Sequence, residues 1–466
     1  MEKLRSFAKS QHVEKAELVF KLCYLCLAFI SFNTFCARQW YLSYLSYGIV
    51  IFGLFIGLLR LTHIKDFITP SIFILVSFCF SYVLSSINTM QYGVIENVQA
   101  LVWMAVQYFL VFAYDKTRDE RGLKKERSII LSVVLIYTFI AAIIGIVMML
   151  TEYSYYEYVE GYNIYGGFIF NRLFGIYMDC NYGAVLSIIS IVISVYIYKS
   201  VNKYIKALLV VNIVAEYLFI CFSDSRTGMM AAFATILVYI ICKDYKGELK
   251  DFYKSKEFWK SLALSIVLVL LFVGSLLIVK NISSEARSAI ARISARNAGA
   301  SVEEQNVAAI EAEIGRYENG VADSNVSNGR FDIWGSAIDL FKAHPIIGVS
   351  FRNNIETARA EIPSTYIAIA GYDSMHNFFF DILSSQGIVG TIIAVFLIAA
   401  ALITVAKTYN QYEEYGLLLS IIAAIFASML FYSETFYMNT PGAFIFWYIL
   451  GYMVNYKGQK RNLVNG

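Results

Sequence analysis

The sequence predicts an all-α fold, a polytopic membrane helix bundle of about 12 transmembrane helices with one large helical extracytoplasmic loop. Of its 466 residues, 58% are hydrophobic and only 16% are charged, and the mean hydropathy is +0.58. A soluble domain carries about 25% charged residues, so lipid is expected to solvate most of this chain. The apolar residues also form runs as long as a membrane helix, and the basic residues are shared unevenly between the connections.

The apolar runs are roughly 17 to 25 residues long, which is the length that crosses a bilayer as a helix. Twelve such runs are found, at residues 18–36, 40–59, 67–86, 97–114, 128–150, 178–198, 205–222, 227–242, 261–279, 387–406, 416–433 and 441–455. The cysteines lie in or beside these runs, so no disulfide framework is expected in the polar part of the chain.

The distribution of lysine and arginine fixes the expected orientation. If the amino terminus lies inside, every inner connection is basic, whereas the short outer connections hold only Arg38, Arg172 and Arg226. An excess of Lys and Arg marks the cytoplasmic loops of membrane proteins. We therefore predict a multi-pass protein of the cell (plasma or inner) membrane with both termini in the cytoplasm.

One outer connection is far longer than the others. It covers residues 280–375, and it separates nine spans in residues 1–279 from three spans in residues 376–466. A long loop inside a compact protein is usually functional rather than a spacer.

Two helices are expected inside this loop. The first is rich in Arg and Ala and contains Arg287, Arg292 and Arg296, and the second runs from about Arg330 to Ala343. The second helix should end at His344, because the proline that follows disfavours the α conformation for the residue before it.

Four outer arginines are candidates for binding an anion, namely Arg172, Arg226, Arg330 and Arg352. Arg226 follows Ser225 in a tight turn that can present backbone N–H groups together with the guanidinium. The two parallel N–H groups of a guanidinium fit two phosphate oxygens. The alternative for each isolated arginine is that it reaches up to the lipid headgroups.

His376 stands at the outer membrane surface, directly before Asn377 and the tenth span. The ordinary pKa of imidazole, about 6.5, suits proton transfer near neutral pH. His376 is therefore a candidate general base or proton shuttle for a hydroxyl group. The alternative is a structural histidine that orients the loop through hydrogen bonds.

Asp179 and Asn181 lie at the outer end of the sixth span, where an aspartate favours a helix N-cap and where both could support a site. The tyrosines from Tyr153 to Tyr165 fit an interfacial aromatic belt, or alternatively flat faces for sugars. No His and Cys cluster, phosphate-loop signature, Ser/His/Asp triad or nucleic-acid patch is found in the sequence. We expect no metal, no cofactor and no nucleic acid, and a divalent ion is the alternative if the scattered outer carboxylates converge.

Four motifs follow one another around the large loop. They are Arg172 with Asp179-Cys180-Asn181, the Ser225-Arg226 turn, Arg330 to Trp334 with His344 to Val349, and His376-Asn377 with Gln386 to Gly390. This set resembles the O-antigen ligase and O-antigen polymerase superfamily (the WaaL and Wzy types) over roughly residues 165–406. Cys180 and Ser350 stand where members of the family often have a proline and a glycine.

The resemblance implies a metal-independent glycosyl transfer on the outer side of the membrane, from a glycan carried on undecaprenyl pyrophosphate. By motif match, Arg172, Arg226 and Arg330 would hold the pyrophosphate, and His376 would position or deprotonate the acceptor hydroxyl. An inverting single displacement is the simplest scheme, because no outer residue stands out as a nucleophile. A chain-length regulator and a flippase are the protein partners that such an enzyme would have.

The bias towards Ile, Lys, Tyr and Asn, with four prolines, is typical of a low-GC Gram-positive bacterium, which has no lipopolysaccharide. It favours a capsular or surface polysaccharide polymerase over a ligase, which stays open as the alternative. A flippase or transporter of lipid-linked sugar would carry ionisable groups near mid-membrane, and here Glu216 is the exception in spans nearly free of charge. A sensor or structural protein would use the loop to bind a partner.

Overall fold

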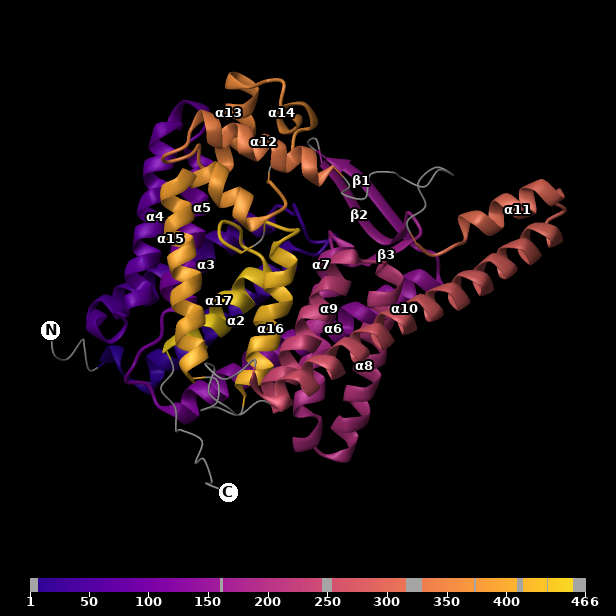
Figure 1. Ribbon diagram of the computed structural model, residues 1–466, viewed down its shortest axis with the longest axis horizontal. Helices are drawn as coiled ribbons and strands as arrows, with labels where there is room; N and C mark the ends of the chain where they lie inside the picture. The colour runs from indigo at the N-terminus through magenta and orange to yellow at the C-terminus, as the bar shows by residue number, and fades with distance from the viewer. Residues whose placement is uncertain are drawn as a thin grey trace.

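The computed structural model describes residues 7–159, 162–244, 254–315, 329–372, 374–408, 414–433 and 435–455. The predicted all-α polytopic bundle is confirmed, since long helices stand side by side with a small sheet and short loop helices at one end (Figure 1). By length and composition, eight helices of the described residues could cross a membrane. They are α3 (Tyr41–Leu61), α4 (Pro70–Asn88), α5 (Ile95–Ala105) continued by the π-helix η3 (Val106–Phe112), α6 (Glu120–Leu150), α7 (Cys180–Ile197) continued by η4 (Tyr198–Ser200), α8 (Lys203–Ser223), α10 (Lys256–Asn297) and α15 (Phe378–Thr408).

Four more helices occupy the positions of the remaining predicted spans. They are α2 (Gln11–Ser31), α9 (Arg226–Asp244), α16 (Tyr415–Met429) and α17 (Pro441–Asn455). The predicted count of twelve spans is thus matched by twelve helical regions, of which eight have the length and hydropathy of a full membrane span. Helices α9 and α16 are apolar but shorter.

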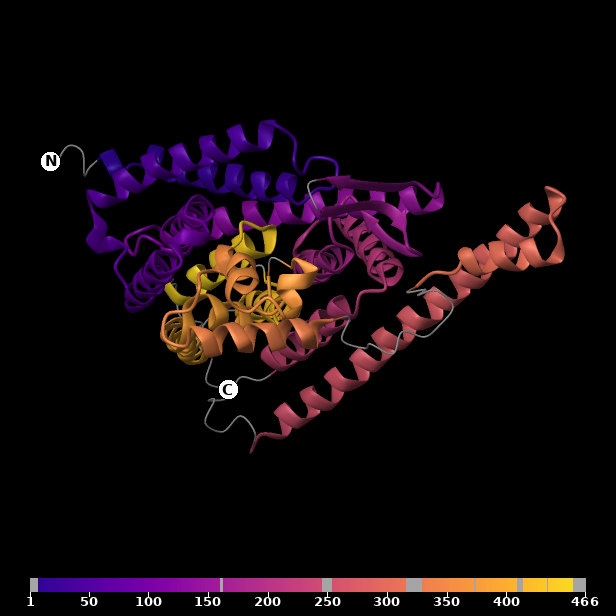
Figure 2. The same ribbon diagram turned by 90° about the horizontal axis from the view of Figure 1, so that it is seen from above.

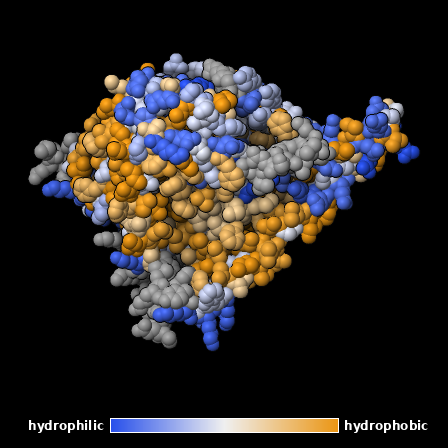
Figure 3. All heavy atoms as spheres, turned by 45° about the horizontal axis from the view of Figure 1, so that its top comes forward, coloured by the Kyte–Doolittle hydropathy of each residue, from blue (hydrophilic) through white to orange (hydrophobic). Residues whose placement is uncertain are grey.

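The core of the bundle lies around α7 and α17. Helix α17 is buried along almost its whole length, and it packs against η3, α16 and α15. Helix α9 packs against α16 and α7, and α15 packs against α4. Many large apolar side chains of the outer helices face outward, and Figure 3 shows them as orange flanks below a bluer cap. Such flanks suit contact with lipid.

A three-stranded antiparallel sheet, not predicted from the sequence, follows α6. It consists of β1 (Ser154–Val159), β2 (Tyr162–Ile169) and β3 (Arg172–Gly175) in the order β1-β2-β3. The tyrosines expected as an interfacial belt form part of it, and Tyr156 of β1 stacks on its cross-strand partner Tyr165 with ring centroids 5.7 Å apart. Aromatic residues pack well on a pleated surface, which explains why this stretch forms strands.

The large loop contains α11 (Val302–Glu311), α12 (Arg330–Ala343), η6 (Phe351–Asn353), α13 (Asn354–Glu361) and α14 (Tyr366–Ala370). The helix predicted from Arg330 to Ala343 is confirmed as α12, with His344 at its C-cap.

The expected helix rich in Arg and Ala is not separate, because it is the last part of α10, which continues without interruption to Asn297. No glycine or proline interrupts residues 275–298, and Gly299 adopts a left-handed φ of 83° after the helix. Helix α11 packs back along α10, and together they extend away from the bundle (Figures 1 and 2).

The connections fall into two groups in space. The sheet and α12–α14 share one end of the bundle, here called the loop end (Figure 1). At the opposite end of the bundle, predicted inner connections contact one another. For example, Arg127 in the first turns of α6 pairs with Glu414, the residue directly before α16, at 2.6 Å. This arrangement agrees with the predicted alternation of the spans, and the loop end corresponds to the side predicted to be extracytoplasmic.

Candidate active site

Each predicted site motif stands at the first turn of a helix. Helix α7 begins after Asp179, α9 begins at Arg226, α12 begins at Arg330 and α15 begins after Asn377. The N-terminus of a helix carries about half a positive charge and unpaired N–H groups, so it favours a nearby anion. The predicted motifs thus lie at the N-termini of four helices, each of which favours an anion.

Polar side chains cap three of these helices. Asp179 Oδ1 accepts a hydrogen bond from the backbone N–H of Asn181 at 2.6 Å, so the expected N-cap is present. Ser225 Oγ accepts from the N–H of Gly228 at 2.9 Å, and Asn377 Oδ1 accepts from the N–H of Phe379 at 2.9 Å. These caps fix where each loop enters its helix.

Asn181 joins three segments that are distant in sequence. Its Oδ1 accepts hydrogen bonds from Arg172 Nη2 at 3.2 Å and from Ser225 Oγ at 2.9 Å. Arg172 Nε also donates to the carbonyl oxygen of Ser223 at 2.9 Å. The strand β3, the last turn of α8 and the first turns of α7 and α9 are therefore tied together at the loop end.

Tyr432, which was not predicted, links this group to His376. Its hydroxyl donates to Asp179 Oδ2 and accepts from Asn181 Nδ2 at 3.3 Å. The His376 ring stands nearly perpendicular to the Tyr432 ring, with centroids 6.1 Å apart. Tyr432 could not be recognised from the sequence, because it falls inside the apolar run 416–433, whereas helix α16 ends at Met429.

Two further groups lie close to this link, one beside Phe431 and the other beside His376. The Arg330 guanidinium lies over the ring of Phe431, with Cζ 5.4 Å from the ring centroid, so it is adjacent to Tyr432. The Tyr372 ring packs against His376 with centroids 5.7 Å apart. Burial, followed by the neighbouring Tyr366, raises the pKa of the Tyr372 phenol, so this phenol is neutral beside the imidazole at physiological pH. His376 itself has a left-handed φ of 50°.

Arg226 borders a polar cavity of about 450 Å³. The cavity is lined by Asp224, Arg226, Met229, Lys280, Glu313, Ile314 and Gly315. Lys280 Nζ pairs with Asp224 Oδ1 at 2.9 Å, which ties α10 to the turn between α8 and α9. Lys280 was not singled out from the sequence, since a lysine at the end of a span is usually interpreted as reaching for the headgroups.

The structure does not bring Arg352 into this group. Its Cζ lies 5.4 Å from the centroid of the Phe351 ring, and its backbone N–H donates to Asn97 Oδ1 at 3.4 Å. Among the described residues, no hydrogen bond or ion pair connects Arg352 to Asn181, Tyr432 or His376.

The outer carboxylates have separate partners. Asp179 caps α7, Asp224 pairs with Lys280, and Asp381 Oδ1 accepts from the N–H of Met375 at 2.8 Å. Asp373 lies outside the described residues. Within the described ranges, no group of three or more His, Cys, Asp or Glu side chains is placed to hold a metal ion.

The segment from His344 to Gly348 packs against the segment from Gln386 to Gly390 through backbone hydrogen bonds. The N–H of Ile388 donates to the carbonyl of Pro345 at 2.9 Å, and the N–H of Val389 donates to that of Ile346 at 3.2 Å. Gly387 interrupts α15 with a φ of 59°, and a Cβ there would lie 2.6 Å from the Ile346 carbonyl oxygen. This close approach requires glycine and fixes the first turns of α15, which follow His376.

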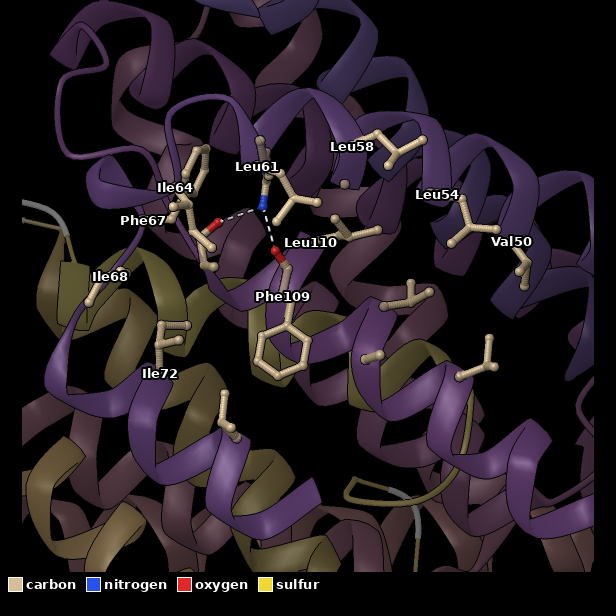
Figure 4. A pocket seen from close by; sticks show the side chains of 18 residues that line it. Val50, Leu54, Leu58, Leu61, Ile64, Phe67, Ile68, Ile72, Phe109 and Leu110 are labelled. Carbon is tan, nitrogen blue, oxygen red and sulfur yellow. Dashed lines mark hydrogen bonds between the residues drawn. The ribbon is translucent and has the colours of Figure 1, made fainter. Parts of the chain in front are cut away.

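A larger cavity elsewhere lacks the chemistry for a reaction. It has a volume of about 610 Å³ and lies between α3, η1 (Ile64–Asp66), α4 and η3, and its lining is almost wholly apolar (Figure 4). Arg60, the charged residue in the lining, donates to the carbonyls of Phe109 at 2.6 Å and Ala113 at 3.2 Å and pairs with Glu17. A cavity of this kind suits hydrocarbon and offers no group to orient a polar substrate.

Comparison with known proteins gives a family match that covers part of the candidate site. Residues 207–395 match the model of a family described as O-Antigen ligase. The matched segment contains Arg226, Arg330 and His376, whereas Arg172, Asn181 and Tyr432 lie outside it. No curated protein matches the chain.

Proposed function

We propose, from the match of residues 207–395 to a family described as O-Antigen ligase, that this chain is an extracytoplasmic glycosyltransferase of the O-antigen ligase and polymerase superfamily. Its substrate is an oligosaccharide repeat unit linked to undecaprenyl pyrophosphate, and its product is a surface or capsular polysaccharide. The observation that carries the proposal is the link through Tyr432 between His376 and the group of Arg172, Asn181 and Ser225.

In the proposed reaction, the hydroxyl oxygen of the acceptor sugar attacks the anomeric carbon of the donor. The bond from this carbon to the pyrophosphate oxygen breaks, and the electron pair leaves with undecaprenyl pyrophosphate. His376 orients the acceptor hydroxyl and takes its proton. The configuration at the anomeric carbon inverts, because one displacement occurs and no covalent enzyme intermediate forms.

Arg172, Arg226 and Arg330 stabilise the negative charge that grows on the pyrophosphate. Fixed cations aimed at a developing charge usually make the largest contribution to catalysis. The N-termini of α7, α9, α12 and α15 add partial positive charges in the same region. Asp179, Asn181, Ser225 and Asn377 hold these ends in place, and Arg352 would act only from the edge of the site.

A membrane setting favours this chemistry. Donor and acceptor are both anchored by lipid, so each reaches the loop end in a limited range of orientations, which lowers the barrier. The proposal locates the protein in the cell (plasma or inner) membrane with both termini in the cytoplasm. A flippase that delivers the donor and a chain-length regulator are its expected partners, and no metal or other cofactor has a role in the scheme.

The test is to incubate the purified full chain in vesicles with a lipid-pyrophosphate-linked repeat unit and to separate the products on a gel. A polymerase gives a ladder of products that differ by one repeat. Products formed only when a different acceptor is added would assign a ligase. Transfer of unchanged substrate between leaflets, with no new glycosidic bond, would contradict glycosyl transfer and favour a flippase.

A further inference from the structure

The core of the bundle contains an acidic side chain that the proposed reaction does not use. Glu216 lies on α8, seven residues before Ser223, and its relative exposure is 0%. At 1.5 Å per residue, it lies roughly 10 Å below the end of α8 that holds Arg172. A carboxyl group inside a membrane bundle is costly, and it is usually functional.

The immediate neighbours of Glu216 are hydroxyl groups. They belong to Ser187 and Ser190 of α7 and to Thr138 of α6. Neither carboxyl oxygen of Glu216 has a partner of hydrogen-bond geometry, and no ion pair with a basic side chain forms, in the part of the chain that the structure describes. The other titratable group nearby is the buried phenol of Tyr177.

Two more buried oxygens in this region have no hydrogen-bond partner among the described residues. Asn212, one turn earlier on α8, donates its amide N–H groups to Ser190 Oγ at 3.1 Å and Ser194 Oγ at 2.9 Å. Its Oδ1 has no hydrogen-bond partner, and neither does Ser187 Oγ, within the described ranges. Asn212 and Ser187 are 2% and 0% exposed, so water does not reach these oxygens from the surface.

We propose that Glu216 anchors a binding site for a monovalent alkali cation, of which sodium is the probe, between α6, α7 and α8. Carboxylate, amide and hydroxyl oxygens are the ligands that hard cations prefer. One carboxylate balances one positive charge, whereas a divalent ion would leave an uncompensated charge in the bundle. A proton is shared by one oxygen and one acceptor, whereas a cation can be contacted by carboxylate, amide and hydroxyl oxygens together.

The site would stabilise the helices that carry the active site. Helix α7 begins with Asn181 in its first turn, and α8 ends at Ser223, whose carbonyl accepts from Arg172. An ion bridging α7 and α8 two turns lower fixes the distance between these ends. This inference goes beyond the proposed function and does not depend on it.

The test is equilibrium binding of radioactive sodium to the purified full chain in detergent at pH 8, with choline chloride keeping the ionic strength constant. The wild-type chain should bind one sodium ion in a saturable manner. The Glu216→Gln variant should lose affinity by about tenfold or more, because it keeps the shape and removes the charge. Glu285→Gln, at an exposed position of α10, is the matched control and should bind as the wild type does.

Ser187→Ala keeps the experiment decisive if Glu216→Gln does not fold. It removes one neutral oxygen and should weaken sodium binding by a smaller factor than the loss of the carboxylate. Absence of saturable binding to the wild-type chain would overturn the proposal, and so would equal binding by all variants. A thermal stability that rises as the pH falls, with no response to sodium, would assign a proton to Glu216 and would also overturn it.

Discussion

The hydroxyl group of Tyr432 links the Asp179 and Asn181 side of the candidate site to the side that holds His376. It donates to Asp179, accepts from Asn181, and sits on the ring that packs against His376. The position of His376 relative to Arg172 should therefore depend on this side chain.

We predict that Tyr432→Phe lowers the rate of chain growth by about 10- to 100-fold, because small displacements of catalytic groups have effects of this size. The ring and its contact with His376 are kept, so the amount of folded protein should not change. Tyr204→Phe, at a position that is 76% exposed, is the control and should have the wild-type rate. An unchanged rate in Tyr432→Phe would remove Tyr432 from the site.

Site residues that lie at the ends of apolar spans could be recognised from the sequence, whereas a site residue inside an apolar run, such as Tyr432, could not. Arg172, Asn181, Ser225 and His376 were singled out because each is unusual at the edge of a span, and the structure brings them into one region. Tyr432 is an ordinary residue for an apolar run, so composition carries no signal for it. Its role depends on contacts over 251 residues of sequence, which local patterns do not encode.

At the scale of the element, the break in α15 at Gly387 is the feature with the strictest steric requirement. We predict that Gly387→Ala lowers the free energy of unfolding by about 1 to 3 kcal/mol, because the φ of 59° and the nearby Ile346 carbonyl both oppose a Cβ. Thermal unfolding in detergent measures this effect as a lower midpoint temperature.

Gly274→Ala is the matched control for this prediction. It lies inside α10, and a Cβ there meets no atom within 4 Å. Alanine is the better helix former, so the variant should be as stable as the wild type or slightly more stable. Equal midpoints for the two variants would contradict the steric account of Gly387.

Elements with strong local signals were predicted well. Helix α12 has the bounds expected from its sequence, because Pro345 ends it. The sheet β1–β3 was missed because the tyrosines of this stretch are equally typical of a membrane interface. The length of α10 was not predicted, because the span was ended at residue 279, where the sequence becomes polar. No helix breaker stands at this border, so the helix continues.

At the scale of the whole molecule, the proposed function depends on which side of the membrane carries the loop end. We predict that Ser301→Cys, in the loop before α11, reacts with a membrane-impermeant maleimide in intact cells. Ser200→Cys, at the end of η4, should react only after the cells are made permeable. Both serines are exposed in the structure, so a difference in labelling reports the side of the membrane.

The unsubstituted chain gives the background of this experiment, since it already contains seven cysteines. The orientation of the spans was predicted from the distribution of Lys and Arg along the whole chain. The two groups of connections in the structure agree with this prediction. Labelling of Ser200→Cys in intact cells, without labelling of Ser301→Cys, would place the loop end in the cytosol.

The central claim is that the arginines and His376 at the loop end form one active site for glycosyl transfer. The most direct measurement compares product length on a gel for vesicles that contain equal amounts of wild-type, Arg226→Ala, His376→Ala and Arg359→Ala protein, each supplied with a lipid-pyrophosphate-linked repeat unit. Arg359 is an exposed loop arginine paired with Glu356, so its variant is the control. We predict a full ladder for the wild type and Arg359→Ala, and no chain growth for Arg226→Ala and His376→Ala, whereas a wild-type ladder from both of these variants would contradict the claim.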